Sequence, residues 1–331
     1  MRLPFFSTDD DPVLEVTLFK TNNHIFRIRT GDKTYYLKTH TRDWYSENGK
    51  ETGHVVLREA TAWQIIEKIG LATPRVIAID NTTDNVIGIP FIITEELLGE
   101  SLTELLTRLS RADAYSAIRC VGAYLKKMHS ISFGHTGYLP PQEPVINSQW
   151  HHRIWSYHGF QSWADREQET AKKELSHGSF SDVLRYIDEW QHKLRKVYKH
   201  PRFVHGDCRA NQFYLFQRGR EWNVSGVLDM EVASAGDCDE DFMKFCAEMS
   251  RRFDVETKWW EPLFDGYEEE PDFNLLKLRY LASGQLELSP FAYKEVAGVR
   301  ELVVQHLLRA KNWLELFDLS SIKEKYNNLY S

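Results

Sequence analysis

The chain has 331 residues and 42% hydrophobic composition, which is enough for a sizeable core in one large domain or in two lobes. Its formal net charge of −7 disfavours nucleic acid as the main partner, and no apolar run reaches the roughly 20 residues that a membrane-spanning helix needs. The four cysteines are far apart and form no Cys-x-x-Cys pair, so neither a zinc site nor a disulfide framework is indicated. Composition therefore predicts a soluble cytoplasmic protein without nucleic-acid or membrane partners, and it leaves the oligomeric state open.

The first 97 residues show patterns typical of strands, with one helix among them. The runs "IFRIRT" and "TYYLKTH" flank "GDK", which predicts a β-hairpin of residues 25–30 and 34–40. The run "LREATAWQIIEKIG" has the apolar spacing of a helix that stops at Gly70. The run "NVIGIPFIITEEL", residues 85–97, then predicts two further strands.

Most of the remaining chain is predicted to be helical. "GESLTELL" contains a capping box from Ser101 to Glu104, and apolar residues then recur at helical spacing from Ala114 to Met128. Residues 134–165 are rich in Gly, Pro, His and Trp and predict an irregular connection. We therefore expect one boundary near residue 97, between an N-terminal part, 1–97, and a helical C-terminal part, 98–331.

The stretch "FVHGDCRANQFYLFQRGREWNVSGVLDME", residues 203–231, places polar side chains at the open end of a predicted hairpin. Residues 212–216 and 222–228 are two β-prone runs joined by "QRGRE". The start of the first strand of an antiparallel hairpin lies beside the end of its second strand, so Gln212 and Asp229 should be neighbours. Asp207, in the loop before the first strand, should lie near them. Two carboxylates and an amide are ligands that suit Mg²⁺.

These motifs resemble the aminoglycoside phosphotransferase and choline kinase superfamily of small-molecule kinases. "HGDCRANQ" is similar to the family's H-G-D-x-x-x-x-N loop, and "VLDMEVASAGDCDEDF" is similar to its strand-terminal Asp with the acidic residues that follow. The resemblance extends in the family's order over roughly residues 20–245. It implies an α+β, two-lobed, protein-kinase-like fold, with a small β-rich N-terminal lobe and a larger, mainly helical C-terminal lobe. It also implies ATP or GTP as the phosphoryl donor and Mg²⁺ as the cofactor.

The resemblance assigns roles to the residues of the loop and the hairpin. Asp207 would be the catalytic base that accepts the proton of the acceptor hydroxyl, and Asp229 the main metal ligand. Gln212 stands where relatives have Asn and would be the second metal ligand, although the adjacent Asn211 is an alternative. Arg209 would reach the γ-phosphate or be an ordinary surface residue. The predicted supporting residues are His205, Asn211, Glu231 and Asp241.

The nucleotide site is expected in the N-terminal part. Lys38 ends the strand "YYL" and matches the family lysine that contacts nucleotide phosphates, while Glu59 lies on the apolar face of its helix and is the expected partner of Lys38. Asn23 belongs to "TNNHIF", at the place of the phosphate-covering turn. Adenine would bond to backbone from Glu95 to Leu97. Thr94 would lie behind the base.

Three functions remain open at the level of sequence: an active small-molecule kinase, a silent nucleotide-binding protein of the same fold, and a metal-dependent hydrolase. The resemblance implies that the phosphate acceptor would be a small molecule with a hydroxyl group. Acidic residues near the site, Glu231, Asp237 and Asp239, hint that this acceptor carries an amine. His151 and His152 resemble a metal pair, but adjacent side chains point apart, which favours a polar loop. The Trp-rich stretch 150–163 is typical of packing.

Overall fold

The protein is described here from a computed structural model that covers residues 13–20, 23–40, 52–134, 136–139, 171–197, 200–282 and 298–327. His151, His152 and the stretch 150–163 lie outside these residues, as does most of the connection predicted over 134–165. None of the helices within these ranges is long and apolar enough to span a membrane.

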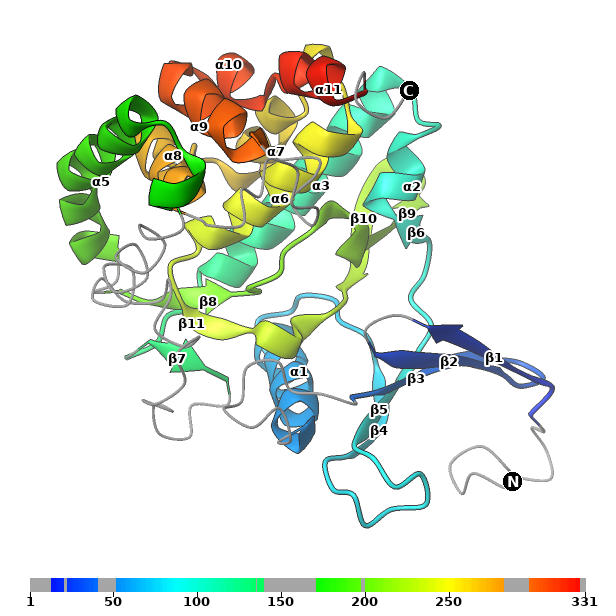
Figure 1. The fold of residues 1–331 in the computed structure, drawn as a ribbon. Coiled ribbons are helices and arrows are strands. Elements are labelled where there is room, and N and C mark those ends of the chain that lie inside the picture. Colours follow the sequence, from blue (N-terminus) through cyan, green and yellow to red (C-terminus); the bar gives the residue numbers. More distant parts are fainter. Residues whose placement is uncertain are drawn as a thin grey trace.

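A five-stranded antiparallel sheet forms the N-terminal part (Figure 1). Its strands lie in the order β1-β2-β3-β5-β4. The predicted hairpin is present as β2 and β3, joined at Gly31 and Asp32. Helix α1 lies beside this sheet and continues to Glu67, close to the predicted stop at Gly70, where φ is +79°. The bounds are Glu15–Lys20 (β1), His24–Arg29 (β2), Thr34–Thr39 (β3), Thr52–Glu67 (α1), Val76–Asp80 (β4) and Phe91–Glu95 (β5).

One strand prediction is wrong. Of the two strands expected within residues 85–97, only β5 forms, and the edge strand beside it, β4, lies earlier in the chain. The Asn85 side chain accepts hydrogen bonds from the backbone N–H groups of Ile87 and Gly88, which folds the first half of this stretch into a turn. An Asn that bonds to its own backbone competes with strand pairing in this way.

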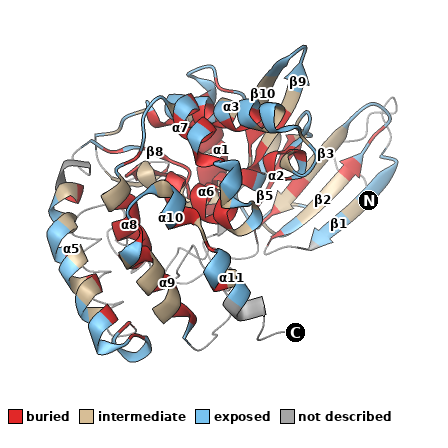
Figure 2. Cartoon of the chain, turned by 90° about the horizontal axis from the view of Figure 1, so that it is seen from above, coloured by how far each residue is buried: buried red, intermediate tan, exposed pale blue. Residues whose placement is uncertain are grey.

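The C-terminal part is mainly helical, and its core surrounds α3 and α6. The capping box at Ser101 and the long helix after it are both present, as α2 and α3. Figure 2 shows buried residues concentrated on α6, whereas α5 presents much of its length to solvent. The helices are Leu102–Leu106 (α2), Arg111–His129 (α3), His177–Val197 (α5), Asp239–Arg252 (α6), Trp260–Tyr267 (α7), Phe273–Ala282 (α8), Val299–Arg309 (α9), Trp313–Phe317 (α10) and Ser320–Asn327 (α11).

Two small sheets position the polar loops between these parts. In one, β9 and β10 form the hairpin predicted from the sequence, with β6 on its outer side. In the other, β11 lies between β7 and β8. The strands are Glu100–Ser101 (β6), Gly137–Tyr138 (β7), Arg202–Val204 (β8), Phe213–Arg218 (β9), Glu221–Val227 (β10) and Ser234–Gly236 (β11).

Candidate active site

The β9–β10 hairpin brings together the residues that the sequence predicted at its open end. Gln212 lies in a short 3₁₀ turn just before β9, and its carbonyl accepts a hydrogen bond of 3.0 Å from the backbone N–H of Leu228. The Gln212 Nε2 atom lies 3.3 Å from Asp229 Oδ2. The predicted neighbourhood of these two residues is therefore confirmed.

Asp241 holds the loop that carries Asp207. Its buried carboxylate accepts hydrogen bonds from the backbone N–H groups of His205 (2.8 Å) and Gly206 (2.9 Å). At Gly206 φ is +85°, and a Cβ atom would lie 2.6 Å from the carbonyl oxygen of Val232, so only glycine fits this turn. Asp241, which was predicted to be a supporting residue, thus binds the backbone of this loop directly.

His205 links this loop to the backbone before Asp229. Its Nδ1 atom accepts from the N–H of Asp207 at 3.3 Å, and its Nε2 atom lies 2.9 Å from the carbonyl oxygen of Leu228, to which it donates. Because both ring nitrogens are engaged, His205 offers no ligand atom to a metal. This arrangement does not suit a hydrolase site built on His205, Asp207 and Asp229.

Two cationic side chains face the carboxylate of Asp207. Arg209 Nε lies 3.1 Å from Oδ1 and 3.2 Å from Oδ2, and Lys244 Nζ lies 3.7 Å from Oδ1. Lys244 was missed in the sequence. Its position three residues after Asp241 on α6 was the available signal, because residues three apart share a helix face.

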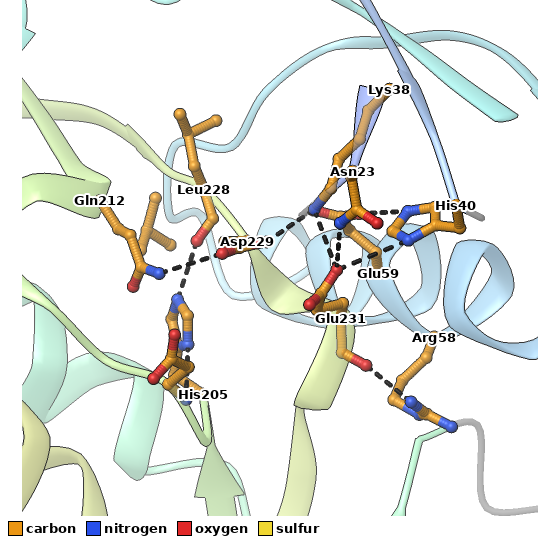
Figure 3. A network of polar contacts seen from close by, with 12 residues as sticks. Asn23, Lys38, His40, Arg58, Glu59, His205, Gln212, Leu228, Asp229 and Glu231 are labelled. Carbon is orange, nitrogen blue, oxygen red and sulfur yellow. Dashed lines mark hydrogen bonds and ion pairs between the residues drawn. The ribbon is translucent and has the colours of Figure 1, made fainter. Parts of the chain in front are cut away.

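Lys38 lies at the centre of a network of carboxylates (Figure 3). Its Nζ atom is 2.6 Å from Asp229 Oδ1, 3.1 Å from Glu59 Oε1 and 3.4 Å from Glu231 Oε2. The predicted ion pair between Lys38 and Glu59 is therefore present. Through Asp229, Lys38 also links the N-terminal sheet to the hairpin of the C-terminal part.

The pKa values in this network follow from burial and mutual contact. Burial alone would lower the pKa of Lys38, but Asp229, Glu59 and Glu231 outweigh it and raise the pKa well above its usual value. Burial would raise the pKa values of Glu59 and Asp229, but Lys38 holds both of them below their usual range. Burial raises the pKa of Glu231, and the neighbouring Asp229 and Glu59 carboxylates add to this rise.

Further polar side chains complete the network around Glu231 and Glu59. Asn23 donates from Nδ2 to Glu231 Oε2 at 2.9 Å. His40 was not predicted, yet its Nε2 atom is 3.3 Å from Glu59 Oε2 and its Nδ1 atom is 3.5 Å from Glu231 Oε2. His40 follows Lys38 by two residues, a spacing that places two side chains on the same face of an extended chain.

The expected adenine-binding segment is the end of β5 and the residues after it. Lys38 pairs with Ile92 in the sheet register, so Thr94 points to the same face as Lys38 and Glu95 to the opposite face. The Glu95 side chain forms ion pairs with Lys33 and Arg75. Leu97 packs close to Gly226, where a Cβ atom would lie 2.6 Å from Leu97 Cδ2. The structure therefore brings Thr94, but not the Glu95 side chain, to the face that carries Lys38.

The charges around Lys38 fit a divalent cation. Among the described residues, three carboxylates face the ammonium group of Lys38. Mg²⁺ prefers carboxylate oxygen ligands and would balance this charge. The Gln212 amide is differently placed: its Oε1 atom accepts from the Arg209 N–H at 3.0 Å, so its Nε2 atom faces Asp229. Asn211 is exposed, which leaves Gln212 as the amide beside Asp229.

The acidic residues that hinted at an amine-bearing acceptor lie in different environments. Asp237 is fully buried and bonded to the guanidinium of Arg279, whose Nη1 atom is also 3.6 Å from Asp239. Burial raises the pKa of Asp239 to about 6, although Arg279 opposes this. Asp237 is neutralised by Arg279 and gives no support for an amine. The four cysteines are free thiols.

Comparison with solved structures shows the same fold in three phosphotransferases or proposed phosphotransferases. A protein from Ralstonia eutropha JMP134 that has been proposed to be an aminoglycoside phosphotransferase matches with a TM-score of 0.57 and 16% identity, over 95% of this chain and 93% of its own. The ADP-bound aminoglycoside phosphotransferase APH(2'')-Ib matches with a TM-score of 0.50 and 18% identity, over 92% and 95%. A proposed fructosamine-3-kinase from Haemophilus somnus 129PT matches with a TM-score of 0.52 and 15% identity, over 90% and 92%.

These likenesses establish the fold, and a sequence profile establishes the family. The five-stranded sheet followed by a mainly helical region is the predicted two-lobed, kinase-like fold. A search of curated proteins found no match. The profile of the phosphotransferase enzyme family, however, matches residues 19–308, which is most of the chain. The chain therefore belongs to the phosphotransferase enzyme family.

Proposed function

We propose that this protein transfers the γ-phosphate of ATP or GTP to a hydroxyl group of a small molecule, with Mg²⁺ as the cofactor. The observation that carries this proposal is the convergence of Lys38, Asp229 and Gln212 at the end of one hairpin, beside the loop that presents Asp207. Membership of the phosphotransferase enzyme family supports the reaction type.

The nucleotide would lie between residues 1–97 and residues 98–331, which we propose as the two domains. Lys38 would contact its phosphates, with Glu59 holding the lysine in place. Asn23 would contribute a polar group near the phosphates. The backbone from Glu95 to Leu97 would bond to the base. Thr94, on the same sheet face as Lys38, would lie behind it.

Asp229 would be the main residue that holds the metal, with Glu231 close enough to support it. When bound, Mg²⁺ would neutralise charge on the phosphates during transfer. For Gln212 to contribute an oxygen, its amide must rotate away from the Arg209 N–H to which it is bonded. A rotation of this kind costs one hydrogen bond to the loop backbone.

Asp207 would orient the acceptor hydroxyl and accept its proton. Its carboxylate is 29% exposed and lies in a loop fixed by Asp241 and His205, so it is both accessible and positioned. In the described arrangement Arg209 bonds to this carboxylate. Arg209 would turn from Asp207 toward the γ-phosphate when nucleotide binds, since a guanidinium favours phosphate oxygens.

A silent nucleotide-binding protein is the second candidate, and two observations favour it. The Gln212 amide directs Nε2 rather than its oxygen toward Asp229, and Arg209 is hydrogen-bonded to the carboxylate of Asp207. Both features require rearrangement before catalysis, whereas Lys38 and Asp229 could hold a nucleotide without it.

The test combines binding with turnover. Nucleotide-dependent thermal shifts, with and without Mg²⁺, should show stabilisation by ATP or GTP that depends on Mg²⁺. Consumption of ATP should then be screened against aminoglycosides, amino alcohols, sugars and macrolides, because relatives of this fold include an aminoglycoside phosphotransferase and a proposed fructosamine-3-kinase. Binding without consumption for any acceptor would favour the silent protein, and absence of binding would contradict both candidates.

A further inference from the structure

Asp229 has a backbone conformation that its surroundings must maintain. Its φ and ψ are 66° and 47°, in the left-handed region that residues with a side chain rarely adopt. Such conformations persist where neighbouring groups hold the chain in place, and they occur often at functional sites. The contacts that hold residues 227–231 therefore determine where the Asp229 carboxylate points.

In the part of the chain that the structure describes, three side chains from outside this segment bind its backbone carbonyls. His205 binds the carbonyl of Leu228, as described above. The other two come from a single helix, α1: Trp63 Nε1 donates to the carbonyl oxygen of Val227 at 2.9 Å, and Arg58 Nη1 donates to that of Glu231 at 2.6 Å. Both α1 side chains are almost fully buried, with 3% and 5% exposure. Figure 3 shows the Arg58 contact below Glu231.

The two α1 contacts lie on either side of Asp229, two residues before it and two residues after it. Helix α1 also carries Glu59, the partner of Lys38. The same helix therefore positions the lysine side chain and the backbone that presents the carboxylate 2.6 Å from it. Arg58 is itself fixed from the far side, because its guanidinium lies over the ring of Tyr138 at 4.2 Å.

We propose that Arg58 and Trp63 are positioning residues that clamp the Asp229 turn onto helix α1 and so set the metal-binding geometry. This inference rests on the proposed function for its metal, but the two contacts that form the clamp involve only the protein's own side chains and backbone. Neither residue touches the nucleotide or the acceptor in this proposal. They act through the backbone of residues 227 and 231, and partners of this kind commonly alter metal affinity or activity by about 10–100-fold.

The variants that test the clamp are Trp63→Phe and Arg58→Met. Trp63→Phe removes the indole N–H and keeps an aromatic ring, whereas Arg58→Met keeps an unbranched chain and removes the donors. Arg58→Lys restores a cationic donor and should recover part of the loss. Ile66→Val is the matched control, because Ile66 is fully buried on the same helix and has no polar side-chain atom to bind the turn.

The first measurement needs neither metal nor nucleotide. Hydrogen exchange of the free protein should report faster exchange at the N–H groups of Leu228 and Ala233 in both clamp variants, since these two amides are hydrogen-bonded on either side of Asp229. The control should leave both rates near wild type. Unchanged rates in the clamp variants, or an equal rise in the control, would overturn the proposal.

The second measurement separates positioning from general stability. Thermal shifts are measured with nucleotide present while Mg²⁺ is titrated. The Mg²⁺ concentration that gives half of the maximal shift should rise about 10–100-fold in the clamp variants. Nucleotide binding in EDTA should stay unchanged. An unchanged Mg²⁺ requirement would overturn the role in metal geometry. If the wild-type protein showed no Mg²⁺-dependent binding, the proposed function would fail, and hydrogen exchange alone would still decide whether the clamp exists.

Discussion

The Gln212 amide lies between two parts of the candidate site, with Nε2 3.3 Å from Asp229 Oδ2 and Oε1 3.0 Å from the backbone nitrogen of Arg209. The pairing of the predicted hairpin strands correctly placed Gln212 beside Asp229, whereas Asn211 is exposed. The orientation of the amide was not predictable, because it depends on a bond to the backbone N–H of Arg209 that exists only once the loop has folded.

Replacement of this amide gives a prediction for metal dependence. Gln212→Ala should raise the Mg²⁺ concentration needed for half-maximal activity by about 10-fold, the lower end of the effects seen when a metal's immediate surroundings change. Asn211→Ala is the matched control and should have little effect, because that side chain points to solvent. Titration of Mg²⁺ in a turnover assay measures both, and the opposite ranking would exclude Gln212 as the amide of this site.

His40 and Lys244 were missed for a common physical reason. Each lies at a spacing that places it on the correct face of its element, but many surface residues have the same spacing. Only the tertiary contacts, 3.3 Å from His40 to Glu59 and 3.7 Å from Lys244 to Asp207, distinguish them. The sequence therefore predicted the site residues that belong to a motif. It did not predict those that only a tertiary contact reveals.

The elements were predicted best where the sequence carries a local turn or capping signal. The hairpins β2–β3 and β9–β10 have clear turn residues, and α2 has a capping box, so all three were found. Strand β1 was not predicted. Its alternating apolar side chains, Val16 and Leu18, are exposed at the edge of the sheet and are not part of a buried core. The strand expected near residue 87 failed because Asn85 forms a turn with its own backbone.

The crossing of α3 and α7 provides a prediction at the scale of elements. At Gly266 a Cβ atom would overlap the carbonyl oxygen of Arg119, and at Gly122 it would overlap that of Leu263, so glycine on each helix permits the close approach. Gly266→Ala should therefore lower the free energy of unfolding by about 1–3 kcal/mol, as overpacking of a core does.

The control for this change is Gly178→Ala in the first turn of α5, where a Cβ atom would meet nothing within 4 Å. Urea unfolding should show the loss at Gly266 and no loss at Gly178, where alanine favours the helix. Equal stability of the wild-type and Gly266→Ala proteins would mean that the helices do not cross as closely as described.

On the scale of the whole molecule, the order of the parts was predictable and the contacts between them were not. The switch from strand patterns to helix patterns after residue 97 predicted a sheet followed by a helical region, which is the observed architecture. The ion pair of Lys38 with Asp229 joins residues 191 positions apart in the chain, and no local pattern encodes it. The ion pair of Lys38 with Glu59 was predicted, but that of Lys38 with Asp229 was found only in the structure.

Substitution of Lys38 therefore tests whether the N-terminal sheet and the C-terminal hairpin bind the nucleotide together. Lys38→Ala should leave the protein folded but lower nucleotide affinity roughly 10–100-fold, because hydrogen bonds to a charged group contribute about 1.5–3 kcal/mol. It should also reduce stability, since Glu59 is 1% exposed and loses its cationic partner. Isothermal titration and circular dichroism measure the two effects. Wild-type affinity in a folded variant would remove Lys38 from the nucleotide site.

The central claim is phosphoryl transfer to a hydroxyl group oriented by Asp207, and one measurement tests it most directly. Transfer of labelled γ-phosphate to the acceptor found by screening should fall about 10²–10⁴-fold in Asp207→Asn, which is the usual contribution of general-base assistance. Nucleotide affinity should stay close to wild type, because Lys38 and Asp229 are retained, whereas Asp229→Asn should lose Mg²⁺-dependent binding as well. Near-normal transfer by Asp207→Asn would contradict the account.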